Sequence, residues 1–211
     1  MKIIDISKEG FTAARKPTEP EPKIQKLNRL AYGDEDNQSA VYASCQMGTH
    51  ILTPDYVFGQ DDSDDLSTDT LSLAKTIGPV TVLTVPSPII TGEVVENYFP
   101  WNARRLILRT ENGEPLSFFA GAAEDIAAIG YQLIGFEGFL GDGATNLSPY
   151  RDLMAQGAVL LEGLDLSKVE RDGEFFLFAQ PVKWDGLEAA PCRALLVADE
   201  MNWSSSKSRL F

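Results

Sequence analysis

From Pro79 onward the sequence alternates short apolar runs with helix-like stretches, and this alternation constrains the fold more than any other feature. The runs PVTVLTV, RLILRT, YQLIGFE and AVLLEG are rich in branched apolar residues, which is typical of strands buried on both faces. Helical stretches lead directly into strands, as crossover connections between parallel strands require. Two further strand-like runs follow, EFFLFAQPV and RALLVA. The pattern predicts a single mixed α/β domain with a large β component.

The ends of two helices can be placed from their boundary residues. In LSFFAGAAEDIAAIG, Ser117 is expected to cap a helix and Gly130 to end it in the left-handed conformation. A second helix, PYRDLMAQ, is expected to begin at Ser148 and Pro149 and to be closed by Gly157.

The N-terminal region is expected to form an arm. A β-like run at residues 2–6 precedes Pro17, Pro20 and Pro22, which are excluded from helix interiors and central strands. We therefore expect residues 1–38 to comprise a strand and a surface arm.

Three further segments have simple expected roles. Residues 40–45 are expected to form a strand. The charge run DDSDD at residues 61–65 is best interpreted as a solvated loop, with a cation site as the alternative. Residues 204–211 are expected to be a tail that frays or packs on a neighbour.

Composition restricts the partners and the compartment. The net charge of −13 and the pI near 4.5 argue against nucleic acid or an anionic membrane as a partner, because phosphates would be repelled. No apolar run reaches the roughly 18 residues of a membrane-spanning helix, and the N-terminus carries no apolar leader. Cys45 and Cys192 do not make a disulfide framework. We expect a soluble, cytoplasmic protein that binds a small molecule.

The segment QMGTHILTPDY, residues 46–56, resembles the signature HxGTHxDxPxH of the cyclase family, which includes kynurenine formamidases and isatin hydrolases. Four positions match in register: Gly48, Thr49, His50 and Pro54. Three defining positions, occupied in the family by histidine, aspartate and histidine, differ here: Gln46, Leu52 and Tyr56.

The resemblance continues along the chain. The opening MKIIDIS, the stretch from LILRT to YQLIGFE and the closing FFLFAQPVKWDGLEAAPCRALLV are similar to family segments in the same order. In SPYRDLMAQGAVLLEGLDLSKV, Tyr150 stands where the family has a histidine, whereas Arg151 and Glu162 are kept. The similar segments cover nearly the whole chain.

The resemblance implies a single swivelling β/β/α-type α/β domain with a mixed sheet, assembled as a homodimer or homotetramer. It also implies a zinc or manganese ion that activates water against an amide or lactone carbonyl. The corresponding ligand positions are Gln46, His50, Leu52, Tyr150 and Glu162, with a general acid/base at the position of Tyr56.

These residues are too poor in donors for a catalytic metal, which needs about three nitrogen, sulfur or carboxylate ligands. His50 is the single histidine of the chain, and Leu52 has no lone pair. Gln46 offers a weak amide ligand, and Cys45 is expected to face away from Gln46 if the segment is extended. We therefore expect no metal cofactor.

Two uses of the pocket follow. In a catalytic use, His50 is a general base, Glu162 orients it, and Tyr56 and Tyr150 donate hydrogen bonds to an oxyanion. The reaction is then hydrolysis or cyclisation of a small cyclic or aromatic amide or lactone. In the alternative use, the protein is a non-catalytic ligand-binding protein or oligomeric scaffold.

Residues expected to contact the substrate are Gln46, Thr49, Leu52 and Phe136. Phe136 belongs with Phe139 to the glycine-rich stretch GFEGFLGDG, which lacks the GxGxxG spacing of a nucleotide site. Both phenylalanines, together with Trp101, are candidates for an apolar wall, with core packing as the alternative.

Simpler structural roles also exist for the polar candidates. Glu162 can form an ion pair with Arg151 or Arg193, because a buried carboxylate must be satisfied. The tyrosines can fill core volume, and Gln46 can anchor its loop through hydrogen bonds.

Overall fold

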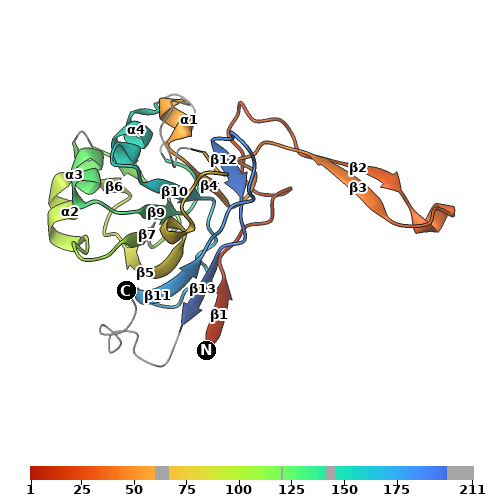
Figure 1. The fold of residues 1–211 in the computed structure, drawn as a ribbon. Helices are drawn as coiled ribbons and strands as arrows, with labels where there is room; N and C mark the ends of the chain where they lie inside the picture. Colours follow the sequence, from red (N-terminus) through yellow and green to blue (C-terminus); the bar gives the residue numbers. More distant parts are fainter. Residues whose placement is uncertain (60–66, 120, 141–145, 199–211) are drawn as a thin grey trace.

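A nine-stranded mixed sheet, described by a computed structural model, organises the chain (Figure 1). The structure describes residues 1–59, 67–119, 121–140 and 146–198. The strand order in the sheet is β1-β13-β11-β5-β7-β9-β10-β4-β12. The predictions for DDSDD and for the C-terminal tail lie outside the described residues.

The centre of the sheet is parallel, as the crossover pattern predicted. Its strands are β5 (Ile77–Thr84), β7 (Arg105–Arg109), β9 (Leu133–Phe136) and β10 (Val159–Glu162). All residues of β9 and β10 are buried, which confirms the interpretation of these runs as strands covered on both faces.

Antiparallel strands extend both sides of the parallel centre. On one side lie β11 (Gly173–Phe178), β13 (Leu195–Ala198) and β1 (Lys2–Asp5). On the other side lie β4 (His50–Leu52) and β12 (Ala189–Pro191). A separate two-stranded pairing joins β6 (Ile89–Ile90) to β8 (Ser117–Phe118).

Short helices gather on one side of the sheet in Figure 1: α1 (Asp55–Phe58), α2 (Gly92–Tyr98), α3 (Ala122–Ile129) and α4 (Ser148–Met154). Two 3-10 turns are also present, η1 (Leu30–Tyr32) and η2 (Leu73–Lys75). Among the described residues, none of the helices is long and apolar enough to cross a lipid bilayer.

Two hydrophobic cores cover the two faces of the sheet. The first packs the helices against Leu106, Leu108, Ile134 and Leu160. The second joins Ile107, Leu133 and Leu161 to residues of both flanks, such as Ile51 of β4 and Leu196 of β13. Because residues from distant strands meet in this second core, the sheet must curl around it.

The boundaries of the predicted helices were right in part. Gly130 ends α3 with a φ of 83°, as predicted, and Gly157 closes the turn after α4. Ser117 does not cap α3, because it pairs in β8 and Gly121 precedes the helix instead.

The N-terminal arm contains a β-hairpin that projects from the body of the molecule (Figure 1). Its strands are β2 (Lys23–Asn28) and β3 (Gln38–Tyr42), so the predicted strand at residues 40–45 begins and ends earlier than expected. The segment before the hairpin lies largely at the surface, but the side chain of Lys16 is buried, which the expectation of a surface arm did not include.

Candidate functional site

His50 and Glu162 are brought together by the pairing of β4 with β10. The antiparallel register places His50 directly opposite Glu162 and Leu52 opposite Leu160. Side chains alternate along each strand, so all four lie on the helix-covered face. The structure therefore brings the side chains of residues 50 and 162 together in the buried interior.

Two glycines allow the backbones on either side of this pair to approach closely. Gly48 has a φ of 61° and Gly163 a φ of 69°, and a Cβ atom on Gly163 would clash with the carbonyl oxygen of Gly48. Between them, the hydroxyl of Thr49 donates to the carbonyl of Gly163 at 2.5 Å and accepts from the N–H of Lys8 at 2.8 Å. The Gly-Thr-His sequence thus fixes the backbone that presents His50.

The orientation of the His50 ring follows from its backbone contact. Nδ1 lies 3.0 Å from the carbonyl oxygen of Gly48, which can only accept, so Nδ1 carries a proton. Nε2 then faces Oε2 of Glu162 at 3.3 Å. The alignment of these two atoms does not meet hydrogen-bond geometry, so the contact is a close approach of the ring nitrogen to the carboxylate. Both side chains are fully buried.

Tyr150 holds the other oxygen of the carboxylate. It lies on α4, and its hydroxyl donates to Oε1 of Glu162 at 2.7 Å while accepting from the N–H of Leu140 at 3.2 Å. Burial, together with the negative charge of Glu162, raises the pKa of Tyr150. Because its one proton is directed to Glu162, Tyr150 acts on the carboxylate rather than on a substrate oxygen.

Lys16 is a site residue that the sequence analysis missed. Its side chain is only 4% exposed, and its Nζ lies 3.5 Å from Oε2 of Glu162, 3.0 Å from Oε1 of Gln46 and 3.2 Å from the hydroxyl of Tyr56. The structural alternative of an ion pair between Glu162 and arginine was wrong, since Lys16 fills that role and Arg193 pairs with Asp5. No periodic pattern in the proline-rich segment marks Lys16 as buried.

The charge state of Glu162 reflects these neighbours. Burial alone would raise the pKa of Glu162, but the contact with His50 and the positive charge of Lys16 outweigh it, and the pKa lies below its ordinary value. Glu162 is therefore a buried carboxylate in its ionised form at neutral pH.

Three aromatic rings enclose the Lys16 ammonium group. Their centroids lie 4.8 Å, 5.2 Å and 5.3 Å from Nζ, for Tyr56, Phe139 and Tyr150 respectively. Tyr56 and Tyr150 pack edge to face at 5.4 Å, and Phe139 lies 6.5 Å from the His50 ring. The negative faces of such rings attract a cation within about 6 Å.

Glu19 is a second residue that the sequence analysis missed. Within the part of the chain that the structure describes, both its carboxylate oxygens are buried and have no hydrogen-bond partner. Burial raises the pKa of Glu19 and outweighs the attraction of Lys16 and His50. A carboxyl group with a raised pKa beside a histidine is able to hold or give a proton, and no pattern in the sequence separates Glu19 from its exposed neighbours.

Gln46 lies in the site as predicted, but Cys45 does not face away from it. Both side chains reach Oε1 of Glu188, Sγ of Cys45 at 2.9 Å and Nε2 of Gln46 at 3.4 Å. The expectation failed because residues 45 and 46 form a turn rather than an extended strand. Burial and the contact with Glu188 raise the pKa of Cys45 to about 12, so its thiol is not a ready nucleophile.

The other residues expected to contact the substrate lie outside this group of polar side chains. Leu52 and Phe136 are fully buried in the helix-side core. Thr49 uses its hydroxyl to hold the backbone, and Trp101 is exposed. Phe139 is the one of the three wall candidates that lies against His50.

The donors at these positions do not fit a zinc or manganese ion. Of the five ligand positions that the resemblance implies, His50 and Glu162 alone carry strong metal ligands. Over the ranges that the structure describes, no three His, Cys, Asp or Glu side chains converge as a metal site would need. The centre of the group is instead approached by a lysine, whose positive charge disfavours a second cation.

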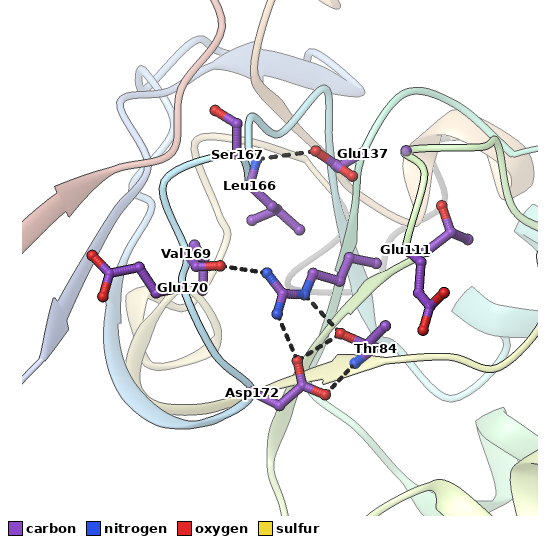
Figure 2. A pocket seen from close by; sticks show the side chains of 11 residues that line it. Thr84, Glu111, Glu137, Leu166, Ser167, Val169, Glu170 and Asp172 are labelled. Atoms are coloured by element: carbon purple, nitrogen blue, oxygen red, sulfur yellow. Dashed lines mark hydrogen bonds and ion pairs between the residues drawn. The ribbon is translucent and has the colours of Figure 1, made fainter.

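A separate hollow of about 810 Å³ is shown in Figure 2. Its central group, the guanidinium of Arg109, donates to the hydroxyl of Thr84 at 2.8 Å, to the carbonyl of Val169 at 2.5 Å and to Asp172 at 3.0 Å. Figure 2 shows Thr84 and Asp172 hydrogen-bonded to each other in the wall of the hollow, so these polar groups are already satisfied by protein partners. The hollow is therefore a weaker candidate than the site around Glu162.

The chain is similar to several known proteins along most of its length. It is 30% identical to kynurenine formamidase from Salinibacter ruber over 213 residues, which covers 93% of this chain and 97% of that protein. It is 27% identical to cyclase-like protein 2 from Oryza sativa subsp. japonica over 194 residues, covering 80% of this chain and 68% of that protein. No family model matches the sequence.

Solved structures share the same fold. A potential metal-dependent hydrolase with cyclase activity superposes with a TM-score of 0.76 at 21% identity, covering 92% of this chain and 98% of the other. An isatin hydrolase bound to the product analogue thioisatinate superposes with a TM-score of 0.74 at 19% identity, covering 92% and 91%. These likenesses confirm the predicted single α/β domain with a mixed sheet.

Proposed function

Because this chain belongs to the cyclase and kynurenine formamidase family, we propose that it hydrolyses or cyclises a small cyclic or aromatic amide or lactone without a metal ion. The observation that carries the proposal is the pair formed by His50 and Glu162, 3.3 Å apart, in a group of side chains too poor in ligands for zinc or manganese. The relatives and structural neighbours named above include a kynurenine formamidase, a cyclase-like protein and an isatin hydrolase, and the family's amide and lactone chemistry comes to this chain as part of the proposal.

His50 supplies the proton transfer in this mechanism. Because Nδ1 donates to the carbonyl of Gly48, Nε2 is the ring atom that exchanges a proton. A water molecule that attacks the carbonyl carbon loses a proton to Nε2. That proton then passes to the leaving nitrogen or oxygen as the bond to the carbonyl carbon breaks. Glu162 stabilises the positive ring in between.

The remaining polar groups have distinct roles. Tyr150 positions Glu162 through the 2.7 Å hydrogen bond and does not itself face the substrate. Tyr56 accepts from Lys16, so its own proton remains available for a developing oxyanion.

Substrate access requires a movement. His50, Glu162 and Tyr150 are fully buried, and the segment that carries Lys16 and Glu19 covers them. This segment has turns but no long helix or strand, so we propose that it shifts when a substrate enters.

The complete burial of His50 and Glu162 also favours a second candidate, a non-catalytic protein that binds a small ligand or serves as an oligomeric scaffold. In that case the buried pair only maintains the fold. The two candidates differ in whether His50 contributes to a reaction rate.

The test is an assay of purified protein with an aryl formamide, a cyclic aromatic amide and an aromatic lactone, with and without EDTA. We expect turnover that EDTA does not change, and a loss of about 10²-fold or more in kcat for His50→Gln. Tyr131→Phe, a buried change outside the site, is the control and keeps its rate. Turnover abolished by EDTA would contradict the metal-free mechanism, and no turnover with any substrate favours the binding protein.

We further propose that the protein is a homo-oligomer and that the β2–β3 hairpin makes the contact. A two-stranded hairpin is marginally stable alone, and this one exposes apolar side chains: Ile24, Leu27, Leu30, Tyr32, Val41 and Tyr42. Its strands carry Lys23 and Lys26, and the turn between them carries Asp34, Glu35 and Asp36, so the hairpin offers charges of both signs to a second copy.

Light scattering after size exclusion tests the hairpin contact. We expect a dimer or tetramer for the wild type and a lower mass for the double variant Tyr32→Ser, Val41→Ser. The matched control is Leu73→Ser, an exposed apolar position outside the hairpin, which keeps the wild-type mass. An unchanged mass in the double variant would refute the hairpin contact.

Cytoplasmic location is also a proposal. It is supported by the two cysteines, Cys45 and Cys192, both of which are free thiols. Cell fractionation with an antibody to the protein tests it.

A further inference from the structure

The most unusual feature of the site is a buried ammonium group supplied by an irregular segment. Lysine is rarely buried unless it is paired, because removing its charge from water is unfavourable. Lys16 is nevertheless 4% exposed, and it is compensated by Gln46, Tyr56 and Glu162. Three aromatic rings complete its surroundings. These partners together form a buried binding position for one positive charge.

This charge lies among the residues at which the family resemblance implies metal ligands. Gln46 and Glu162 stand where the family resemblance implies metal ligands, and Tyr56 stands where it implies the general acid/base. Nζ of Lys16 contacts all three, at 3.0 Å, 3.5 Å and 3.2 Å. We propose that the Lys16 ammonium group takes the place of the metal ion as a built-in cation of the site, an inference that rests on the proposed function.

The charges of the site agree with this substitution. Leu52 stands where the family resemblance implies an aspartate, so a negative ligand at this position is absent. At the ligand positions that the resemblance implies, one carboxylate is therefore retained, Glu162, and the single positive charge of Lys16 lies 3.5 Å from it. The aromatic rings of Tyr56, Phe139 and Tyr150 stabilise a cation without adding charge.

The substitution has a chemical consequence. An ammonium group has three N–H donors, so Lys16 can turn one donor from Gln46 or Tyr56 to a carbonyl oxygen of the substrate and stabilise the charge that develops there. It cannot lower the pKa of a bound water as a metal ion does. Activation of water is left to His50, and Lys16 is a catalytic residue that acts on the oxyanion.

Chemical rescue of a truncated lysine tests the proposal without a substrate. Lys16→Ala leaves a cavity and an uncompensated Glu162, and a small ammonium ion from solution can fill both. We expect methylammonium chloride to raise the Tm of Lys16→Ala by about 2 °C or more beyond the same concentration of sodium chloride. Lys16→Met fills the volume without a charge, so it and the wild type should respond equally to both salts.

Two measurements on the wild type keep the test decisive if the variants do not fold. Zinc, manganese and EDTA should leave the Tm of the wild type unchanged. In limited acetylation followed by mass spectrometry, Lys16 should be labelled at least ~10-fold more slowly than the exposed Lys23.

Several results would overturn the inference. These are stoichiometric zinc with a raised Tm in the wild type, equal labelling of Lys16 and Lys23, or no preference of Lys16→Ala for methylammonium. Each readout is independent of turnover. A failure to find a substrate would therefore weaken the proposed hydrolase while leaving the assignment of Lys16 intact.

Discussion

Replacing Tyr150 with phenylalanine removes one oxygen atom from the centre of the site and leaves the ring in place. The lost hydroxyl donates to the ionised Glu162 at 2.7 Å and accepts from the N–H of Leu140 at 3.2 Å. Hydrogen bonds to charged groups contribute about 1.5–3 kcal/mol, and a buried N–H left without a partner costs about 1–3 kcal/mol. Because the two losses share one atom and are not additive, we expect a destabilisation of about 3 kcal/mol.

Urea unfolding followed by far-UV circular dichroism measures this change. The midpoint should fall without a change in m, and the Tm should fall by about 6–12 °C for a domain of this size. Tyr131→Phe is a matched control, because its hydroxyl makes a neutral hydrogen bond to the carbonyl of Pro100 at 2.9 Å and should contribute only about 1 kcal/mol. Tyr98→Phe, at an exposed tyrosine, should be nearly neutral.

The pH dependence of Tyr150→Phe provides a second check. The pKa of Glu162 is lowered in the folded protein, so its stabilising contribution is present above the unfolded pKa of about 4.5 and is lost as pH falls through the folded value. Without the Tyr150 hydrogen bond, that folded value should rise, and acid unfolding should begin at a higher pH. A Tyr150→Phe variant no less stable than Tyr131→Phe would refute the charged hydrogen bond.

Two further predictions concern the neighbouring segments. Glu19→Gln should raise the Tm near neutral pH, because the raised pKa of Glu19 means that its ionisation opposes folding. The gain in Tm should shrink as the pH falls toward about 4.5. Thermal unfolding between pH 4 and 8 measures this trend, and a gain that grows as the pH falls would contradict it. Gly163→Ala should lower the free energy of unfolding in urea by about 3 kcal/mol or more, since it combines a positive φ with a clash against Gly48. The control Gly138→Ala, at a φ of 68° with open space around it, should lower it by about 1–2 kcal/mol. Equal decreases for the two variants would show that the backbones of Gly48 and Gly163 are not in tight contact.

The sequence predicted the α/β fold well, because the signals are local. Continuous apolar runs identify buried strands, and helices that lead directly into them require parallel crossovers. The strand at residues 159–162 and the helix end at Gly130 were found in this way. At Ser117 the local signal for a helix cap was overridden, because this residue pairs with Ile89 between β8 and β6.

The site was predictable where residues belong to a motif. The register of the Gly-Thr-His segment placed His50, and the run that ends at Glu162 placed its partner, so the cross-strand pair was within reach of the sequence. Tyr56 and Tyr150 also lie in the site. The sequence did not specify their partners, which are Lys16 for Tyr56, Glu162 for Tyr150, and the ring of each tyrosine for the other.

The sequence by itself determined the central strands, the two helices between them and the shortage of metal ligands, because periodicity and side-chain chemistry can be read one segment at a time. Only the tertiary structure decided that Lys16 and Glu19 enter the site. They come from a proline-rich segment without periodic burial, and Lys16 meets Glu162 across 146 positions of the chain. A charged side chain is buried when distant groups converge to stabilise it, and that convergence is a property of the folded chain.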